Sequence, residues 1–200
     1  MLFTKTEISV LELFVSRILD RFTIREVSRL IKKDLKIVHT SIRKLIEKEF
    51  IIKDKLNALK LNYKNNIADL AYIENIRKES FLKKNPSVGV HLKNFLKKTK
   101  NKFFILLVFG SYADGKQTKK SDIDLLAILP KENEKFERQL NAALSISNKN
   151  FHVNVISKES FEEMIHKRDE LNVVNETLSN HIIFYGAEQY YALLGERDVR

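Results

Sequence analysis

The sequence predicts an α+β protein that begins with helices and a short β-hairpin, continues through a long helix and ends in a mixed β-sheet with flanking helices. Three amphipathic segments with helical spacing fill residues 6–49, and two short alternating runs follow at 50–61. Strand-like runs at 103–109, 122–129 and 151–156, the first of them continuously apolar, then alternate with helical patterns. With 200 residues, 44% of them apolar, the chain can form one large domain or two small ones.

The first 49 residues are expected to form three short helices. The first helix is expected within residues 6–19, with Thr6 as its N-cap. Thr23 is expected to cap a second helix that runs to Ile31. The third helix spans 36–49 and turns Val38, Ile42, Leu45 and Ile46 inward. Its outward face carries side chains that can bond phosphates and base edges, namely Lys36, His39, Thr40, Arg43 and Lys44.

The runs at 50–53 and 58–61 alternate as the two strands of a hairpin around a polar turn. Three short helices followed by a hairpin resemble the winged helix-turn-helix domains of prokaryotic transcription regulators. The resemblance implies that the third helix enters the major groove of double-stranded DNA and that the hairpin is the wing. The alternative is a small helical module that packs only on its partner domain; we favour DNA binding.

A further helix is expected over residues 66–83, and its broad apolar face suits either a linker or a dimerisation surface. Pro86 ends it, and the next helix, 88–98, is expected to turn Val90, Leu92, Phe95 and Leu96 inward. These patterns predict a winged helix-turn-helix domain at 1–64, a linker helix at 65–85 and a second domain at 86–200. A homodimer is a further expectation, because winged-helix proteins commonly read paired half-sites.

The net charge of +10 is unevenly distributed. Residues 1–100 hold 23 Lys and Arg against 11 Asp and Glu, whereas residues 101–200 hold 13 against 15. A basic half that meets a polyanion would explain this asymmetry, and a general excess of surface lysine is the alternative. The absence of cysteine excludes disulfides, thiolate zinc sites and thiol catalysis. Neither a membrane span nor a signal peptide is recognisable, so we expect a cytoplasmic protein with no membrane partner.

The residues with the clearest chemical meaning follow the apolar run 103–109, which is typical of a buried strand. Gly110 allows a tight turn, and Ser111 can offer its hydroxyl and backbone N–H to an anion. Asp122 and Asp124 stand two apart at the start of the next strand, so both should face the same side of the sheet. Two such carboxylates can bind a hard divalent cation whose coordination is completed by substrate phosphates.

Gly110-Ser111, ten further residues, and then Asp122-x-Asp124 match the G-S-x10-D-x-D signature of DNA polymerase beta-like nucleotidyltransferases. Residues 88–157 are similar to the minimal members of that superfamily, which include antitoxins. The resemblance implies a small mixed sheet and metal-dependent transfer of a nucleoside monophosphate from a nucleoside triphosphate, with ATP the expected donor. It also implies that Gly110 and Ser111 hold the triphosphate and that Asp122 and Asp124 are catalytic ligands of Mg²⁺ or Mn²⁺.

The family's third carboxylate is missing from its expected place. After a helix expected at 132–146, the strand 151–156 carries Asn154 at that position, and an amide is a neutral ligand that cannot act as a base. His152 shares its face and can in principle act as the base, although a lone strand histidine is more often a packing or surface residue. Glu159 and Glu162 follow at the start of a helix expected over 160–168, where acids are favoured in any case.

The remaining sequence predicts a helix at 173–178, a strand at 181–185, a turn at Gly186 and a closing helix at 187–194. The tyrosines in this tail, Tyr185, Tyr190 and Tyr191, are expected to fill the core rather than stack on bases.

Two functional interpretations remain open. In the first, the chain is an enzyme that transfers a nucleotide to a protein side chain, a small molecule or a nucleic acid. In the second, it is a DNA-binding transcription regulator whose nucleotidyltransferase-like domain binds nucleotide without turnover. The charge asymmetry and Asn154 favour the second.

Overall fold

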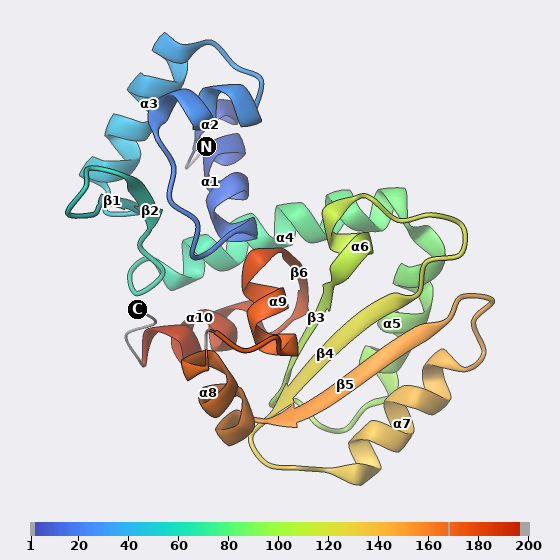
Figure 1. Cartoon of the computed structure of the whole chain (residues 1–200). Coiled ribbons are helices and arrows are strands. Elements are labelled where there is room, and N and C mark those ends of the chain that lie inside the picture. Colours follow the sequence, from blue (N-terminus) through green and yellow to red (C-terminus); the bar gives the residue numbers. More distant parts are fainter. Residues whose placement is uncertain (1–2, 168, 197–200) are drawn as a thin grey trace.

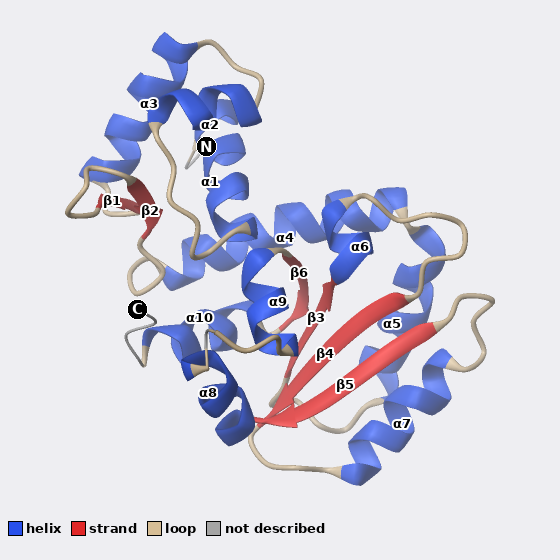
Figure 2. Cartoon of the chain, in the orientation of Figure 1, coloured by secondary structure: helices blue, strands red, loops and turns tan. Residues whose placement is uncertain are grey.

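The computed structural model describes residues 3–167 and 169–196, in which a helical N-terminal unit lies against a C-terminal unit built on a four-stranded sheet (Figure 1). Arg168, the last residue of the helix expected over 160–168, lies outside these ranges. Figure 2 shows that strands are confined to the small hairpin and the sheet. No helix in the described part of the chain combines the length and the apolar character needed to cross a membrane.

The N-terminal unit contains α1 (Lys5–Ser16), α2 (Ile24–Leu30), α3 (Leu35–Glu47), β1 (Ile51–Lys53) and β2 (Leu59–Leu61). The two strands form an antiparallel hairpin, and Phe22 adds an isolated bridge to Leu59. The expected order of three helices and a hairpin is therefore present. Its core consists of the inner faces of the helices, including Phe14, Val27, Val38 and Leu45.

The start of α1 differs from the sequence prediction, because the N-cap is Thr4 and not Thr6. The Thr4 side chain accepts a hydrogen bond from the Glu7 N–H, and the Glu7 carboxylate accepts one from the Thr4 N–H. This reciprocal pair satisfies two otherwise unpaired donors, which a cap at Thr6 would not do. Thr23 and Glu26 repeat the arrangement at α2, which confirms the predicted N-cap at Thr23.

Helix α4 (Ile67–Lys84) joins the two units. It contacts α1 on one side and β6 (His181–Tyr185) and α10 (Ala187–Gly195) on the other. One hydrophobic cluster therefore continues from the N-terminal helices through Leu70 and Ile73 to the sheet and α10. The apolar face expected on this helix is covered by the chain itself.

The sheet contains β3 (Ile105–Phe109), β4 (Ile123–Leu129), β5 (Phe151–Ser157) and β6 in the order β5-β4-β3-β6. Strand β3 runs antiparallel to β4 and β6, whereas β4 and β5 are parallel. The parallel pair requires a crossover, which α7 (Glu134–Leu144) supplies. The mixed sheet with flanking helices predicted from the sequence is thus present.

Helices cover both faces of this sheet. Helices α5 (Pro86–Lys98) and α7 pack on the face that receives Ile123, Leu125 and Ala127, while α8 (Lys158–His166) and α9 (Val173–Ser179) belong to the cluster on the other face, with Leu126 and Ile128. Figure 1 shows these layers. Asp124 alternates with Ile123 and Leu125, so it faces the α8–α9 side.

Two apolar residues lie outside the expected core. Val90 is 56% exposed, because the buried stripe of α5 follows Val88, Leu92 and Phe95 and a residue two positions from Val88 points to the opposite side. Phe103 is 74% exposed because β3 begins only at Ile105.

A buried polar cluster fastens α4 to the sheet. The Arg77 guanidinium donates to Glu74 Oε2 at 2.7 Å and to the His181 carbonyl at 2.5 Å, and the Tyr191 hydroxyl donates to Glu74 Oε1 at 2.8 Å. Burial by itself would raise the pKa of Glu74, but the Arg77 charge, together with His181 and Tyr191, holds it below its ordinary value. The burial of Tyr191 agrees with the expectation that it fills the core, whereas no local pattern indicates the cluster formed by Glu74, Arg77 and His181.

Candidate active site

Pairing of β3 with β4 brings the two halves of the signature together. Phe109, the last residue of β3, is the Cα partner of Asp124, and Gly110 then begins the short helix α6 (Gly110–Asp114). Gly110 has a φ of +65°, in the left-handed region that favours glycine. A Cβ at this position would also collide with Asp124 Oδ2. Backbone conformation and space therefore both require glycine here.

The two acids occupy different environments. Asp124 is the second residue of β4, and its side chain is 28% exposed. Asp122 is exposed and directly precedes β4, which begins at Ile123 and not at Asp122 as predicted. Between them, Ile123 is buried in the cluster on the α5–α7 face. Alternation therefore directs Asp124 away from that cluster, toward the face on which a substrate can reach it.

The residue beside Asp124 on the neighbouring strand is His152 and not Asn154. The parallel register pairs Asp124 with His152 and places Asn154 opposite Leu126, two residues further along. His152 Nδ1 lies 3.4 Å from Asp124 Oδ1, and the His152 side chain is 69% exposed. Strand β5 thus offers an imidazole next to Asp124, and Asn154 follows two residues further along on the same face of the sheet.

The other acids considered from the sequence lie at the far end of β5. Glu159 and Glu162 belong to α8, which follows the carboxyl end of the strand, whereas His152 lies near its amino end. Five residue-to-residue steps of extended chain, from His152 to Ser157, separate the two ends by roughly 16 Å. Glu162 also lies 3.8 Å from the Lys158 ammonium. Neither glutamate can therefore share an ion with Asp124.

The remaining donors suit a magnesium ion only in part. Within residues 3–167 and 169–196, no three His, Cys, Asp or Glu side chains come together as a group able to hold a metal. Magnesium, however, commonly uses one or two carboxylates and takes its other ligands from water and substrate phosphates. Asp122 and Asp124 fit that role, with Gly110 leaving room beside the Asp124 carboxylate.

The outward face predicted for the third helix is exposed, and Figure 1 places α3 at the end of the molecule away from the sheet. The Thr40 hydroxyl donates to the Lys36 carbonyl at 3.0 Å, and Arg43 Nε lies 3.7 Å from Glu47 Oε1. The residues that share this exposure are Lys36, His39, Thr40, Arg43 and Lys44. They lie too far from the acids, across the N-terminal unit, to belong to the same site.

Gly110→Ala should destabilise the fold more than Gly115→Ala. Both glycines have positive φ, +65° and +69°, so each substitution carries a strain of about 1–2 kcal/mol. Gly115 has no neighbour within 4 Å of the added Cβ, whereas at Gly110 the methyl group must displace Asp124. We expect the free energy of unfolding, measured in urea, to fall by at least about 1 kcal/mol more for Gly110→Ala. Equal losses would contradict the close packing of Gly110 against Asp124.

The family comparison agrees with this geometry. Residues 91–188 match the family model described as Polymerase beta, Nucleotidyltransferase. The C-terminal part of the chain thus matches a nucleotidyltransferase domain. The matched range contains Gly110, Ser111, Asp122 and Asp124, and it extends beyond the 88–157 expected from the signature to include β6.

A solved structure described as "Crystal structure of the toxin-antitoxin with AMP-PNP" is similar to part of the chain. It is 19% identical, the match covers 53% of this chain and 79% of that one, and the TM-score is 0.34. Similarity at this level carries no argument about the function of the nucleotidyltransferase domain. No curated protein matches the chain.

Proposed function

We propose that the chain is a metal-dependent nucleotidyltransferase, in which an acceptor nucleophile attacks the α-phosphorus of a nucleoside triphosphate and pyrophosphate leaves. ATP is the expected donor, and the acceptor is a protein side chain, a small molecule or a nucleic acid. The observation that carries the proposal is the contact between Gly110 and the Asp124 carboxylate. It joins the expected phosphate-binding turn to the expected metal ligand within the matched domain.

Each residue has a separate role in this proposal. Gly110 and Ser111 receive the triphosphate through backbone N–H groups and the Ser111 hydroxyl. Asp122 and Asp124 hold the cation, Mg²⁺ or Mn²⁺, which when bound neutralises charge on the phosphates. The imidazole beside Asp124 orients this carboxylate through the 3.4 Å approach of His152 Nδ1 to Oδ1.

The absence of a carboxylate beside Asp124 on β5 favours a second candidate function. Neither the His152 imidazole nor the Asn154 amide supplies negative charge on this strand, so a site with two cations would be less stabilised than in an enzyme with three acids. The alternative function is a DNA-binding regulator whose nucleotidyltransferase-like domain binds a nucleotide without turnover.

An assay for label transfer separates the two functions. The full chain is incubated with each α-labelled nucleoside triphosphate, Mg²⁺ and separated protein, RNA and small-molecule fractions of a cell extract. Label should enter one fraction or the chain itself, and chelation of Mg²⁺ should prevent this. Nucleotide binding without any label transfer would reject the enzyme and support the regulator.

We propose also that the N-terminal unit is a winged helix that binds double-stranded DNA through the outward face of α3 and the hairpin. The support is the order of its elements and the exposure of the three cations Lys36, Arg43 and Lys44. The excess of basic over acidic residues in the first hundred positions would attract a polyanion in the same way.

Replacing both Arg43 and Lys44 by Ala should weaken DNA binding and its salt dependence. Each lost phosphate contact should reduce the slope of log affinity against log salt by about one. The measurement is fluorescence anisotropy with labelled duplex DNA between about 50 and 200 mM salt. Lys93→Ala with Lys97→Ala, two exposed lysines of α5, is the matched control. A DNA affinity that does not change with salt, or an equal loss of affinity in the control, would refute the assignment of DNA binding to α3.

A further inference from the structure

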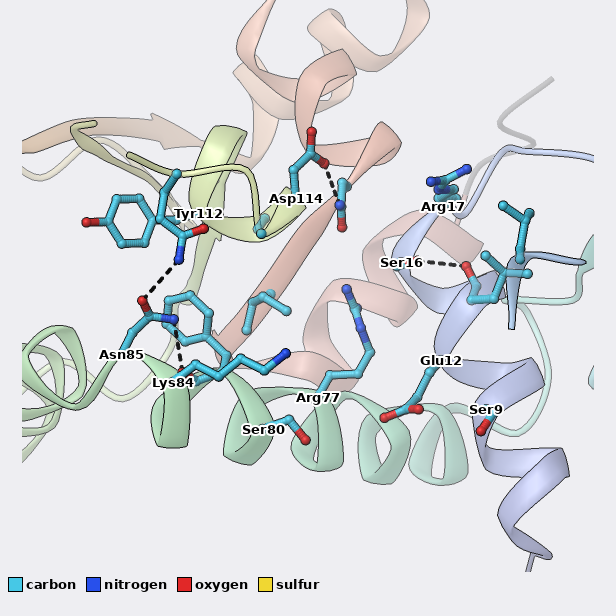
Figure 3. A pocket seen from close by; sticks show the side chains of 18 of the residues that line it. Ser9, Glu12, Ser16, Arg17, Arg77, Ser80, Lys84, Asn85, Tyr112 and Asp114 are labelled. Carbon is cyan, nitrogen blue, oxygen red and sulfur yellow. Dashed lines mark hydrogen bonds between the residues drawn. The ribbon is translucent and has the colours of Figure 1, made fainter. Parts of the chain in front are cut away.

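A cavity of about 530 Å³ lies where the N-terminal unit meets the nucleotidyltransferase domain (Figure 3). Its walls come from α1, α2 and α4 on one side and from α6, the loop that follows it and the start of β6 on the other. The residues of the proposed transfer site, Gly110, Ser111, Asp122 and Asp124, do not line it. The cavity is therefore a separate place for a ligand, with a volume in the range usual for small-molecule sites.

Three cationic side chains line this cavity. Lys84 and Arg77 extend from α4 into the space facing α1, and Arg17 approaches from the end of α1 (Figure 3). Arg77 is only 8% exposed and is already paired with Glu74, whereas the Arg17 guanidinium lies 3.9 Å from Asp20. Arg17 and Lys84 can thus turn toward an anion, while the buried Arg77 stays fixed by its pairing with Glu74.

The same walls hold acceptors that lack a donor. The amide oxygens of Gln117 and Asn180 are buried and have no hydrogen-bond partner among the described residues. The half-buried Glu12 carboxyl also lines the cavity, and burial raises its pKa despite the Arg77 charge. Buried acceptors without donors are costly, so a ligand that brings N–H or O–H groups would be stabilised here.

The end of the cavity formed by α1 and α2 is apolar. It is lined by Leu13, Leu30 and Ile31, and the apolar side chain of Leu30 in α2 is 39% exposed. Phe81 and Ile182 contribute apolar surface from the other side. A ligand with a flat, partly apolar ring would cover these side chains.

We propose that this cavity binds a nucleoside monophosphate at a site separate from the nucleotidyl-transfer site. The phosphate is held by Arg17 and Lys84, the base covers the apolar side chains, and the hydroxyl and amino groups donate to the unpaired amide oxygens. The cationic side chains, the acceptors without a donor and the apolar end of the cavity together match this class of ligand. An inorganic anion would use only the cationic side chains.

Such a ligand would couple the two units. It would touch α1 and α2 of the N-terminal unit and the segment from Tyr112 to Gln117 that follows the Gly110 turn. If the ligand binds one relative arrangement of these elements better than another, it shifts the equilibrium between them by that difference in affinity. The inference does not depend on turnover at Asp124.

The test is calorimetric titration of the full chain carrying Asp122→Ala and Asp124→Ala, in the presence of a chelator, with each of the four ribonucleoside monophosphates. At least one should bind. Arg17→Ala and Lys84→Ala should each weaken binding by about tenfold, the effect of losing one charge-assisted hydrogen bond. Ser80→Trp, which fills the space from α4, should abolish it. The matched controls are Arg25→Ala and Lys83→Ala, exposed residues that do not line the cavity.

The proposal is overturned if none of the four monophosphates binds, or if the controls lose as much affinity as Arg17→Ala and Lys84→Ala. Binding of inorganic phosphate as tightly as of the best monophosphate would also overturn it, because the base would then contribute nothing. The titrated variant lacks the proposed metal ligands, Asp122 and Asp124. The label-transfer assay of the unaltered chain therefore remains an independent measurement whatever the titration shows.

Discussion

Asp124→Asn is expected to lower the rate of nucleotidyl transfer by about a thousandfold or more. An amide has nearly the size of a carboxylate, so the packing against Gly110 is kept, but the negative charge that we propose holds the cation is lost. Metal stabilisation of the transferring phosphate is worth several kcal/mol, and each 1.36 kcal/mol changes a rate about tenfold. The measurement is the initial rate of label transfer at saturating Mg²⁺ and nucleotide.

A control separates this loss from unfolding. Asp69→Asn, at another partly exposed aspartate in the first turn of α4, should leave the rate within about twofold of the unaltered chain, as is usual for substitutions away from a site. Unfolding midpoints of both variants should remain close to that of the parent. A variant Asp124→Asn that keeps a tenth or more of the rate would show that this carboxylate does not hold the catalytic ion.

Arg77→Met is expected to lower the free energy of unfolding by about 3–5 kcal/mol, the usual cost of removing one partner from a buried ion pair. Glu74 would remain fully buried without its counter-charge, and the His181 carbonyl would lose its donor. Urea unfolding measures the change. Lys78→Met, on the next residue of α4 and outside the cluster, should cost less than about 0.5 kcal/mol. Equal effects of the two substitutions would show that the buried cluster contributes little.

The pH dependence of stability gives the same variant a second signature. The folded pKa of Glu74 lies below its ordinary value of 4.5, so its contribution is present above pH 4.5 and is lost as the pH falls through the lowered value. Burial is the largest influence on this carboxyl and Arg77 is the largest opposing one. Without Arg77 the pKa should rise above 4.5, and acidification should then reduce the stability gap between the variant and the parent.

Local patterns in the sequence were enough to predict most elements. The hairpin, the strand ending at Phe109 and the turn at Gly110 follow from short apolar runs and from glycine conformation, which depend on neighbouring residues. The errors lie where two local solutions compete: Thr4 and Thr6 both suit a cap, and only the reciprocal bonds with Glu7 decide between them. Val90 lies outside the core because the buried stripe of α5 follows Val88, Leu92 and Phe95, and apolar character by itself does not indicate that phase.

Spacing along the chain specifies turns and strand faces, so the order of helices and strands could be predicted from the residues, and Gly110, Ser111, Asp122 and Asp124 could be selected as candidate site residues. Three features became visible in the folded chain alone: His152 stands beside Asp124, Glu74, Arg77 and His181 form one buried cluster, and a cavity separates α1 from α6. These features depend on strand register and on contacts between residues far apart in the chain, which side-chain periodicity does not encode.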